Sequence, residues 1–158
     1  MTTLCFLSAT GGELTLVSQA LSRMRADGLD VTLFGRTKDQ LLDPELSRAF
    51  ARAAARSDAV VLSLHGGTAS CPAWSDLVEA WQDRRDSGLS LPWIHIQPTS
   101  GDDDGLLAAQ EWASGLDDGT WKGLISLLGM SGPDNIEAAL RVLVDRVTDG
   151  NVPVPEVV

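Results

Sequence analysis

The sequence has few of the residues on which several classes of protein depend. Its 12 lysines and arginines are outnumbered by 22 aspartates and glutamates, so the formal net charge is −10. Nucleic acids and anionic membranes bind clustered positive charge, and we expect neither as a partner. No apolar run approaches the roughly 20 residues that a membrane-spanning helix requires, and the N-terminus lacks the basic segment of a secretory signal. These absences predict a cytoplasmic protein.

Cysteine is also rare, and the common cofactor motifs are missing. Cys5 falls in an expected strand and Cys71 in an expected loop, with no C-x-x-C pair, so we expect no disulfide framework. The dinucleotide fingerprint G-x-G-x-x-G and the Walker sequence ending in Gly-Lys-Ser/Thr are both absent. We therefore expect no cofactor bound within this chain.

The chain does contain short apolar segments that alternate with amphipathic helical segments. The expected strands cover residues 3–8, 30–34, 59–64 and 92–98. Before the last of them, Trp74, Leu77 and Trp81 fall on one face of an expected helix. This alternation predicts an α/β fold, with a parallel sheet of about four strands and helices on both faces. Of the few topologies that right-handed crossovers allow, the flavodoxin-like order is favoured.

The last third of the chain is expected to be helical. Apolar residues at helical spacing run from Leu106 to Trp112, from Trp121 to Leu128 and from Ile136 to Val147. Residues 1–148 are therefore predicted to form one α/β domain. Its sheet part covers residues 1–98 and its helical part residues 99–148. Residues 149–158 contain alternating prolines, which is typical of a linker that leads into a longer chain.

Two loops that follow expected strands carry the candidate binding residues. Ligands of open parallel sheets usually meet the protein just past the carboxyl ends of the strands. In the first loop, backbone amides at a helix start could hold an anion, although a tight turn is the favoured interpretation. In the second, two glycines let a ligand approach the backbone, beside hydrogen-bond donors and a titratable group. The candidate substrate- or partner-binding residues are Thr10, Gly11 and Gly12 in the first loop, and His65, Gly66, Gly67, Thr68 and Ser70 in the second.

The two histidines, His65 and His95, belong to strands that are neighbours in the flavodoxin-like order. Two imidazoles near one edge of the sheet could bind a divalent metal ion. The spacing His-x-x-x-His is absent and no carboxylate partner is evident, so histidines that hydrogen-bond within the fold are the favoured interpretation. We assign no catalytic residue, and His65 and His95 stay weak candidates for a metal site.

The order of several short motifs resembles a known family. An apolar strand ends in a Gly-Gly loop, a helix with an early tryptophan follows, and a later strand ends in proline. The residues that carry the resemblance are Leu64, Gly66, Gly67, Ser70, Trp74, Pro98, Gly132, Asn135 and Leu140. In this order they are similar to the N-terminal region of the CobN / magnesium chelatase H-subunit family, and more so to its cobaltochelatase branch. Two positions depart from the pattern: Ser131 stands where a glycine is usual, and Cys71-Pro72-Ala73 displaces an aromatic residue.

The resemblance implies the N-terminal domain of the large subunit of an ATP-dependent chelatase, which inserts cobalt or magnesium into a tetrapyrrole. In that family the large subunit holds the tetrapyrrole substrate and the metal ion, while separate AAA+ subunits hydrolyse ATP. The resemblance further implies a peripheral domain that faces the substrate or a partner subunit. Two alternatives stay open: a stand-alone flavodoxin-like domain that binds a small molecule, and a pure interaction domain.

Overall fold

The four strands among the described residues form one parallel sheet. The computed structural model describes residues 1–63, 71–97, 112, 118–130 and 132–148. The strands are β1 (Thr2–Ser8), β2 (Val31–Thr37), β3 (Ala59–Ser63) and β4 (Trp93–Gln97). All neighbouring strands run parallel in the order β2-β1-β3-β4. The α/β class and the flavodoxin-like strand order predicted from the sequence are therefore confirmed.

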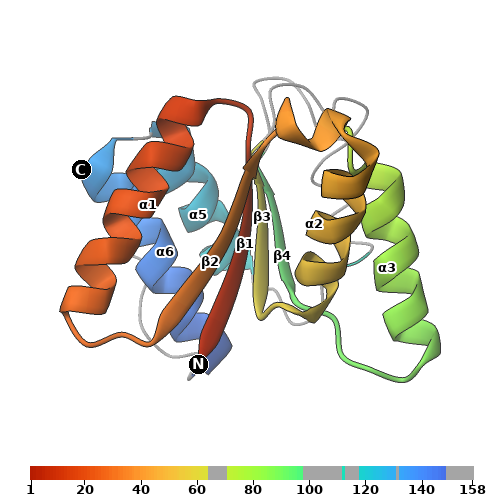
Figure 1. Cartoon of the computed structure of the whole chain (residues 1–158). Coiled ribbons are helices and arrows are strands. Elements are labelled where there is room, and N and C mark those ends of the chain that lie inside the picture. Colours follow the sequence, from red (N-terminus) through yellow and green to blue (C-terminus); the bar gives the residue numbers. More distant parts are fainter. Residues whose placement is uncertain (64–70, 98–111, 113–117, 131, 149–158) are drawn as a thin grey trace.

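Helices cover both faces of the sheet (Figure 1). They are α1 (Gly11–Ala26), the 3₁₀ helix η1 (Gln40–Leu42), α2 (Pro44–Arg56), α3 (Trp74–Asp86), α5 (Asp118–Met130) and α6 (Pro133–Thr148). One face is covered by α2 and α3, and we call it the α2/α3 face. The opposite face is covered by α1 and α6, together with α5, and we call it the α1/α6 face; α5 also contributes Trp121 to the core of the α2/α3 face. None of the helices in the described ranges combines the length and the apolar composition needed to cross a membrane.

Each face of the sheet has its own hydrophobic core, because alternate residues of a strand point to opposite sides. In β1, Cys5 and Leu7 join the core of the α2/α3 face. Leu4 and Phe6, which alternate with them, join the core of the α1/α6 face. All four side chains are buried. The strands are apolar on both sides, as expected for a sheet that lies between two helical layers.

Side chains that bond the first backbone amides fix where α1 and α2 begin. The hydroxyl of Thr10 accepts a hydrogen bond from the backbone N–H of Glu13 at 3.2 Å. Asp43 caps α2 in the same way, with Pro44 in the first turn. Since Thr10 is the cap, α1 already begins at Gly11, and the glycines predicted to form a turn are its first residues.

Two elements are longer than the sequence pattern indicated. The strand expected at residues 30–34 extends to Thr37, because Gly35, Arg36 and Thr37 pair in register with the last residues of β1. Gly35 has no apolar side chain, so periodicity alone could not include it. Likewise the helix expected from Trp121 to Leu128 continues through Met130 in α5, and Gly132 before α6 has a φ of +86°.

Candidate functional site

A row of polar residues crosses the carboxyl edge of the sheet. The last residue of each strand is polar, and these residues stand opposite one another across neighbouring strands. In spatial order they are Thr37, Ser8, Ser63 and Gln97, which we call the carboxyl-edge row. From β1 the chain turns to one side of the sheet and from β3 to the other, so the row includes the switch point where ligands of such sheets bind.

The carboxylate of Glu13 bridges the two central members of this row. Its Oε1 lies 2.6 Å from the hydroxyl of Ser8, and its Oε2 accepts a hydrogen bond from Ser63 at 3.1 Å. Ser8 is completely buried and also accepts the backbone N–H of Thr10 at 3.2 Å. Glu13 stands in the first turn of α1. The start of this helix is thereby attached to the ends of β1 and β3 through one side chain.

The residues of the first predicted loop have distinct places around this carboxylate. Thr10 caps α1, and Gly11 and Gly12 are exposed residues of its first turn. A Cβ atom added to either glycine would meet no atom of the described residues within 4 Å. Within the part of the chain that the structure describes, these glycines therefore have open space beside the switch point.

The second predicted loop lies outside the described residues, since His65, Gly66, Gly67, Thr68 and Ser70 all fall between 64 and 70. Its two ends are described. Before it, β3 ends at Ser63, which bonds Glu13. After it, Cys71 and Ala73 are buried in the core of the α2/α3 face, and α3 begins at Trp74. The last described residue before the Gly-Gly sequence, Ser63, thus lies at the switch point.

His95 lies within β4 and is completely buried, opposite Val61 of β3. Its Nε2 is 2.8 Å from Oε1 of Gln97, and Nε2 of that glutamine donates to the carbonyl of Ile125 in α5, also at 2.8 Å. Because the amide nitrogen is the donor to Ile125, the amide oxygen must accept, and the proton of the histidine stands on Nε2. Nδ1 of His95 has no hydrogen-bond partner among the described residues.

Burial keeps this imidazole neutral. It lowers the pKa of His95 to about 4, and the hydrogen bond with Gln97 opposes that shift only in part. Trp121 of α5 packs against the ring edge to face, with 6.4 Å between the ring centroids. Within the described ranges, no three His, Cys, Asp or Glu side chains are grouped so that they could hold a metal ion. The pairing of His65 with His95 in a metal site stays a prediction.

Both cysteines are buried, Cys5 within β1 and Cys71 just before α3. Burial raises the pKa of each thiol to about 11, and hydrogen bonds lower it only slightly. At neutral pH the thiols are therefore protonated, which disfavours a nucleophilic role.

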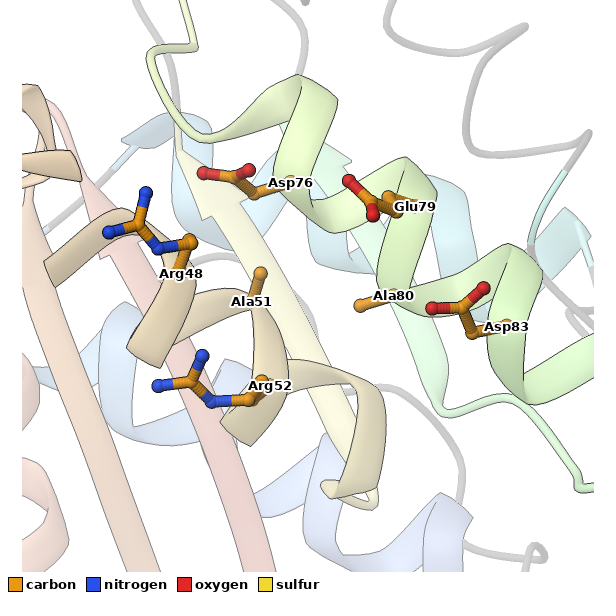
Figure 2. Close-up of a pocket in the computed structure, with 7 residues that line it drawn as sticks. All are labelled: Arg48, Ala51, Arg52, Asp76, Glu79, Ala80 and Asp83. Carbon is orange, nitrogen blue, oxygen red and sulfur yellow. The ribbon is translucent and has the colours of Figure 1, made fainter. Parts of the chain in front are cut away.

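A second polar surface is the groove between α2 and α3, shown in Figure 2. Two arginines of α2 stand on one wall and three acidic residues of α3 on the other, above a floor of two alanines. The lining residues are Arg48, Arg52, Asp76, Glu79, Asp83, Ala51 and Ala80. Its volume of about 150 Å³ is smaller than the roughly 300 Å³ or more of usual small-molecule sites. We regard this groove as a charged surface feature.

The sequence alone did not identify Ser8, Glu13, Ser63 or Gln97 as candidate site residues. Two signals for them were present. Ser8 and Ser63 are polar residues in apolar strands, and the sequence Thr-Gly-Gly-Glu from Thr10 to Glu13 has the spacing of a capping box. No protein-family model matches this sequence, and a search of curated proteins finds no significant match.

Proposed function

We propose that this chain is the N-terminal domain of the large subunit of a cobaltochelatase-type enzyme, which inserts a metal ion into a tetrapyrrole in cobalamin biosynthesis. The proposal starts from the resemblance in the order of its motifs. The observation that supports it best is the position of Ser63, which ends β3 at the switch point of the sheet and is the last described residue before the Gly-Gly sequence. A loop that leaves the sheet there is well placed to contact a substrate or a partner subunit.

Other residues that carry the resemblance have defined structural roles in the fold. Trp74 begins α3, and Gly132 adopts a positive φ in the turn before α6. Asn135 and Leu140 are buried, and Leu140 packs in the core that α6 shares with α1. These residues support the packing of the helices on the sheet, and in our proposal the contact surface itself is the loop of residues 65–70.

In this proposal the domain is a peripheral part of a cytoplasmic enzyme. Metal insertion requires basic groups that remove the pyrrole protons, and a closed cavity where the ion loses its water. We assign those steps, and the cobalt or magnesium ion, to the rest of a longer chain, and ATP hydrolysis to separate AAA+ subunits. The domain itself then contributes affinity for the tetrapyrrole or for a partner subunit.

The test begins with the coding sequence after Val158, which the proposal expects to continue for many hundreds of residues. The full-length protein, combined with its AAA+ subunits, is then assayed for ATP-dependent insertion of cobalt into a corrin-type tetrapyrrole, followed by absorbance. Replacing Gly66 and Gly67 by alanine is expected to raise the KM for the tetrapyrrole or to weaken subunit binding, with kcat largely kept. A stop codon directly after Val158, or unchanged kinetics and subunit binding, would contradict the proposal.

A second candidate function, a small-molecule binding domain that acts alone, is favoured by the open glycines beside the switch point. Tryptophan fluorescence separates the two, because Trp74 lies directly after the loop and is only partly buried. The isolated chain is titrated with a corrin-type tetrapyrrole, a flavin and a nucleotide. Saturable quenching by the flavin or the nucleotide would favour the second candidate, and no response to any of the three would favour an interaction domain.

A further inference from the structure

The first turn of α1 holds a negative charge that belongs to the chain itself. Parallel sheets of this order bind flavin at the switch point, and phosphate groups commonly lie at helix N-termini. We propose that the Glu13 carboxylate occupies that phosphate position, so that the carboxyl edge of the sheet takes ligands without a phosphate group. This inference concerns the class of ligand and does not depend on the chelatase proposal.

The contacts of Glu13 are those that a bound anion would make. Each oxygen faces a serine hydroxyl, at 2.6 Å from Ser8 and 3.1 Å from Ser63. These serines are the last residues of β1 and β3 and stand directly opposite each other in the sheet. Ser8 is completely buried, so its hydroxyl has no access to bulk water. The carboxylate therefore fills a position between two serine hydroxyls, and the single proton of Ser8 is shared between this carboxylate and the carbonyl of Thr10 at 2.8 Å.

The negative charge of Glu13 also interacts favourably with the dipole of helix α1. The partial positive charge at the start of α1 attracts one anion in the first turn, and Glu13 supplies it. A phosphate that approached the same turn would meet a fixed negative charge and would have to displace it from both serines. A neutral or cationic group would meet no such repulsion, and the exposed Gly11 and Gly12 leave space for it.

The test removes the carboxylate and asks whether an external anion replaces it. Glu13→Ala leaves the two serine hydroxyls facing a gap, and Glu13→Ser is a second gap variant that keeps a polar side chain in the first turn. Glu13→Gln fills the same space without the charge. The matched control is Glu45→Ala, which removes an exposed acidic residue from the first turn of α2, where no such serines bond it.

Unfolding midpoints are measured in rising inorganic phosphate or acetate, with sodium chloride of equal ionic strength as the reference. The two gap variants are expected to unfold at lower temperature than wild type and to regain part of that loss saturably with either anion, because a ligand that binds only the folded state stabilises it. Wild type, Glu13→Gln and Glu45→Ala are expected to show no saturable response. NMR of the wild-type amides of residues 10–13, titrated with phosphate and with flavin mononucleotide, gives an independent readout.

Four results would overturn the inference. They are saturable shifts of the wild-type amides with phosphate or flavin mononucleotide, gap variants as stable as wild type, gap variants that fold but gain nothing from either anion, and a Glu13→Gln response equal to that of Glu13→Ala. The last result would mean that the charge of Glu13 alone repels phosphate, and that its side chain does not occupy the phosphate position between the serines. If neither gap variant folds, the inference is decided by the NMR titrations of the wild type and by the unfolding midpoints of Glu13→Gln in the two anions.

Discussion

The two faces of the sheet are packed in different ways. The α2/α3 face is built mainly from apolar and aromatic side chains, with Trp81 at its centre and Trp74 packed against it edge to face. The α1/α6 face has an apolar core as well, but it also buries His95 and Gln97 and carries the Ser8–Glu13 contact. A buried polar group costs free energy unless it is hydrogen-bonded. The α1/α6 face therefore depends on specific partners, whereas the α2/α3 face depends on filled volume.

The largest expected effect comes from removing volume on the α2/α3 face. Trp81 is fully buried, and Trp81→Ala is expected to lower the free energy of unfolding by about 3–5 kcal/mol, because it leaves a large cavity. Urea denaturation followed by circular dichroism measures this loss. Trp81→Phe is the matched control. It should cost less, since it keeps an aromatic ring and removes an indole N–H that has no hydrogen-bond partner among the described residues. A loss below about 1 kcal/mol for Trp81→Ala would contradict this view of the face.

The second prediction concerns pH and the α1/α6 face. Burial lowers the pKa of His95 from 6.5 to about 4, so the unfolded chain binds a proton at a pH where the folded chain does not. The stability contribution of neutral His95 is therefore complete above pH 6.5 and is lost progressively as the pH falls toward 4, by about 3 kcal/mol in total.

The control for this prediction is His95→Gln, which has no titratable group. It should be less stable than wild type at pH 7, and the difference between the two proteins should shrink as the pH falls from 6.5 to 4. Carboxylates titrate in both proteins, so the comparison isolates the histidine. Urea denaturation at several pH values provides the measurement, and a difference that stays constant across this range would show that His95 titrates normally.

A third, smaller effect is expected where α1 packs on β2. A Cβ atom at Gly35 would lie 2.8 Å from Cδ1 of Leu14. Gly35→Ala should therefore destabilise the protein by about 1 kcal/mol, a modest cost because the end of a leucine side chain can shift. Adding Leu14→Ala should remove this penalty in a double-mutant cycle. Gly12→Ala is the control, since its added Cβ meets nothing within 4 Å. Equal effects of the two glycine variants would refute the steric explanation.

The smallest effect is expected on the outer surface of the α1/α6 face. Glu137 of α6 forms ion pairs with Arg23 of α1 and with Arg141, and Arg141 also pairs with Asp27. The hydrogen bond from Arg23, and then that from Arg141, holds the pKa of Glu137 below its usual value. Exposed pairs contribute little, so Glu137→Gln should cost about 0.5 kcal/mol, and less in high salt. A loss that is larger and independent of salt would mean that the network is effectively buried.

The fold followed from the sequence because its signals are local. Asp43-Pro44 stands at the start of α2, and Gly28, with a positive φ, follows the end of α1, and both are signals that neighbouring residues carry. The strand order followed from general rules of crossover and handedness. The extent of β2 did not, because Gly35 and Arg36 are in a strand only through pairing with β1, which depends on a distant part of the chain.

The positions of the candidate site residues were predicted only in part, because some of them depend on contacts with distant parts of the chain. Thr10, Gly11 and Gly12 were correctly placed at the end of β1, since their position follows from that strand alone. The bond between Glu13 and Ser63 joins residues 50 positions apart, and no local pattern reports it. His95 was a weak candidate for a metal site near the edge of the sheet. The structure places it within β4, and Gln97 is the residue at the end of that strand.

The hydrogen bond from Gln97 to Ile125 also limits how the chain can be shortened. It joins the last residue of β4 to a residue of α5 that lies 28 positions later, and Gly129 leaves room for the glutamine amide one turn further on. A fragment that ended at residue 98 would leave the apolar side chains of the α1/α6 face, such as Phe6 and Val61, without the cover of α5 and α6. Sheet and C-terminal helices are therefore expected to unfold in one cooperative step, and residues 1–148 form the shortest fragment that we expect to fold.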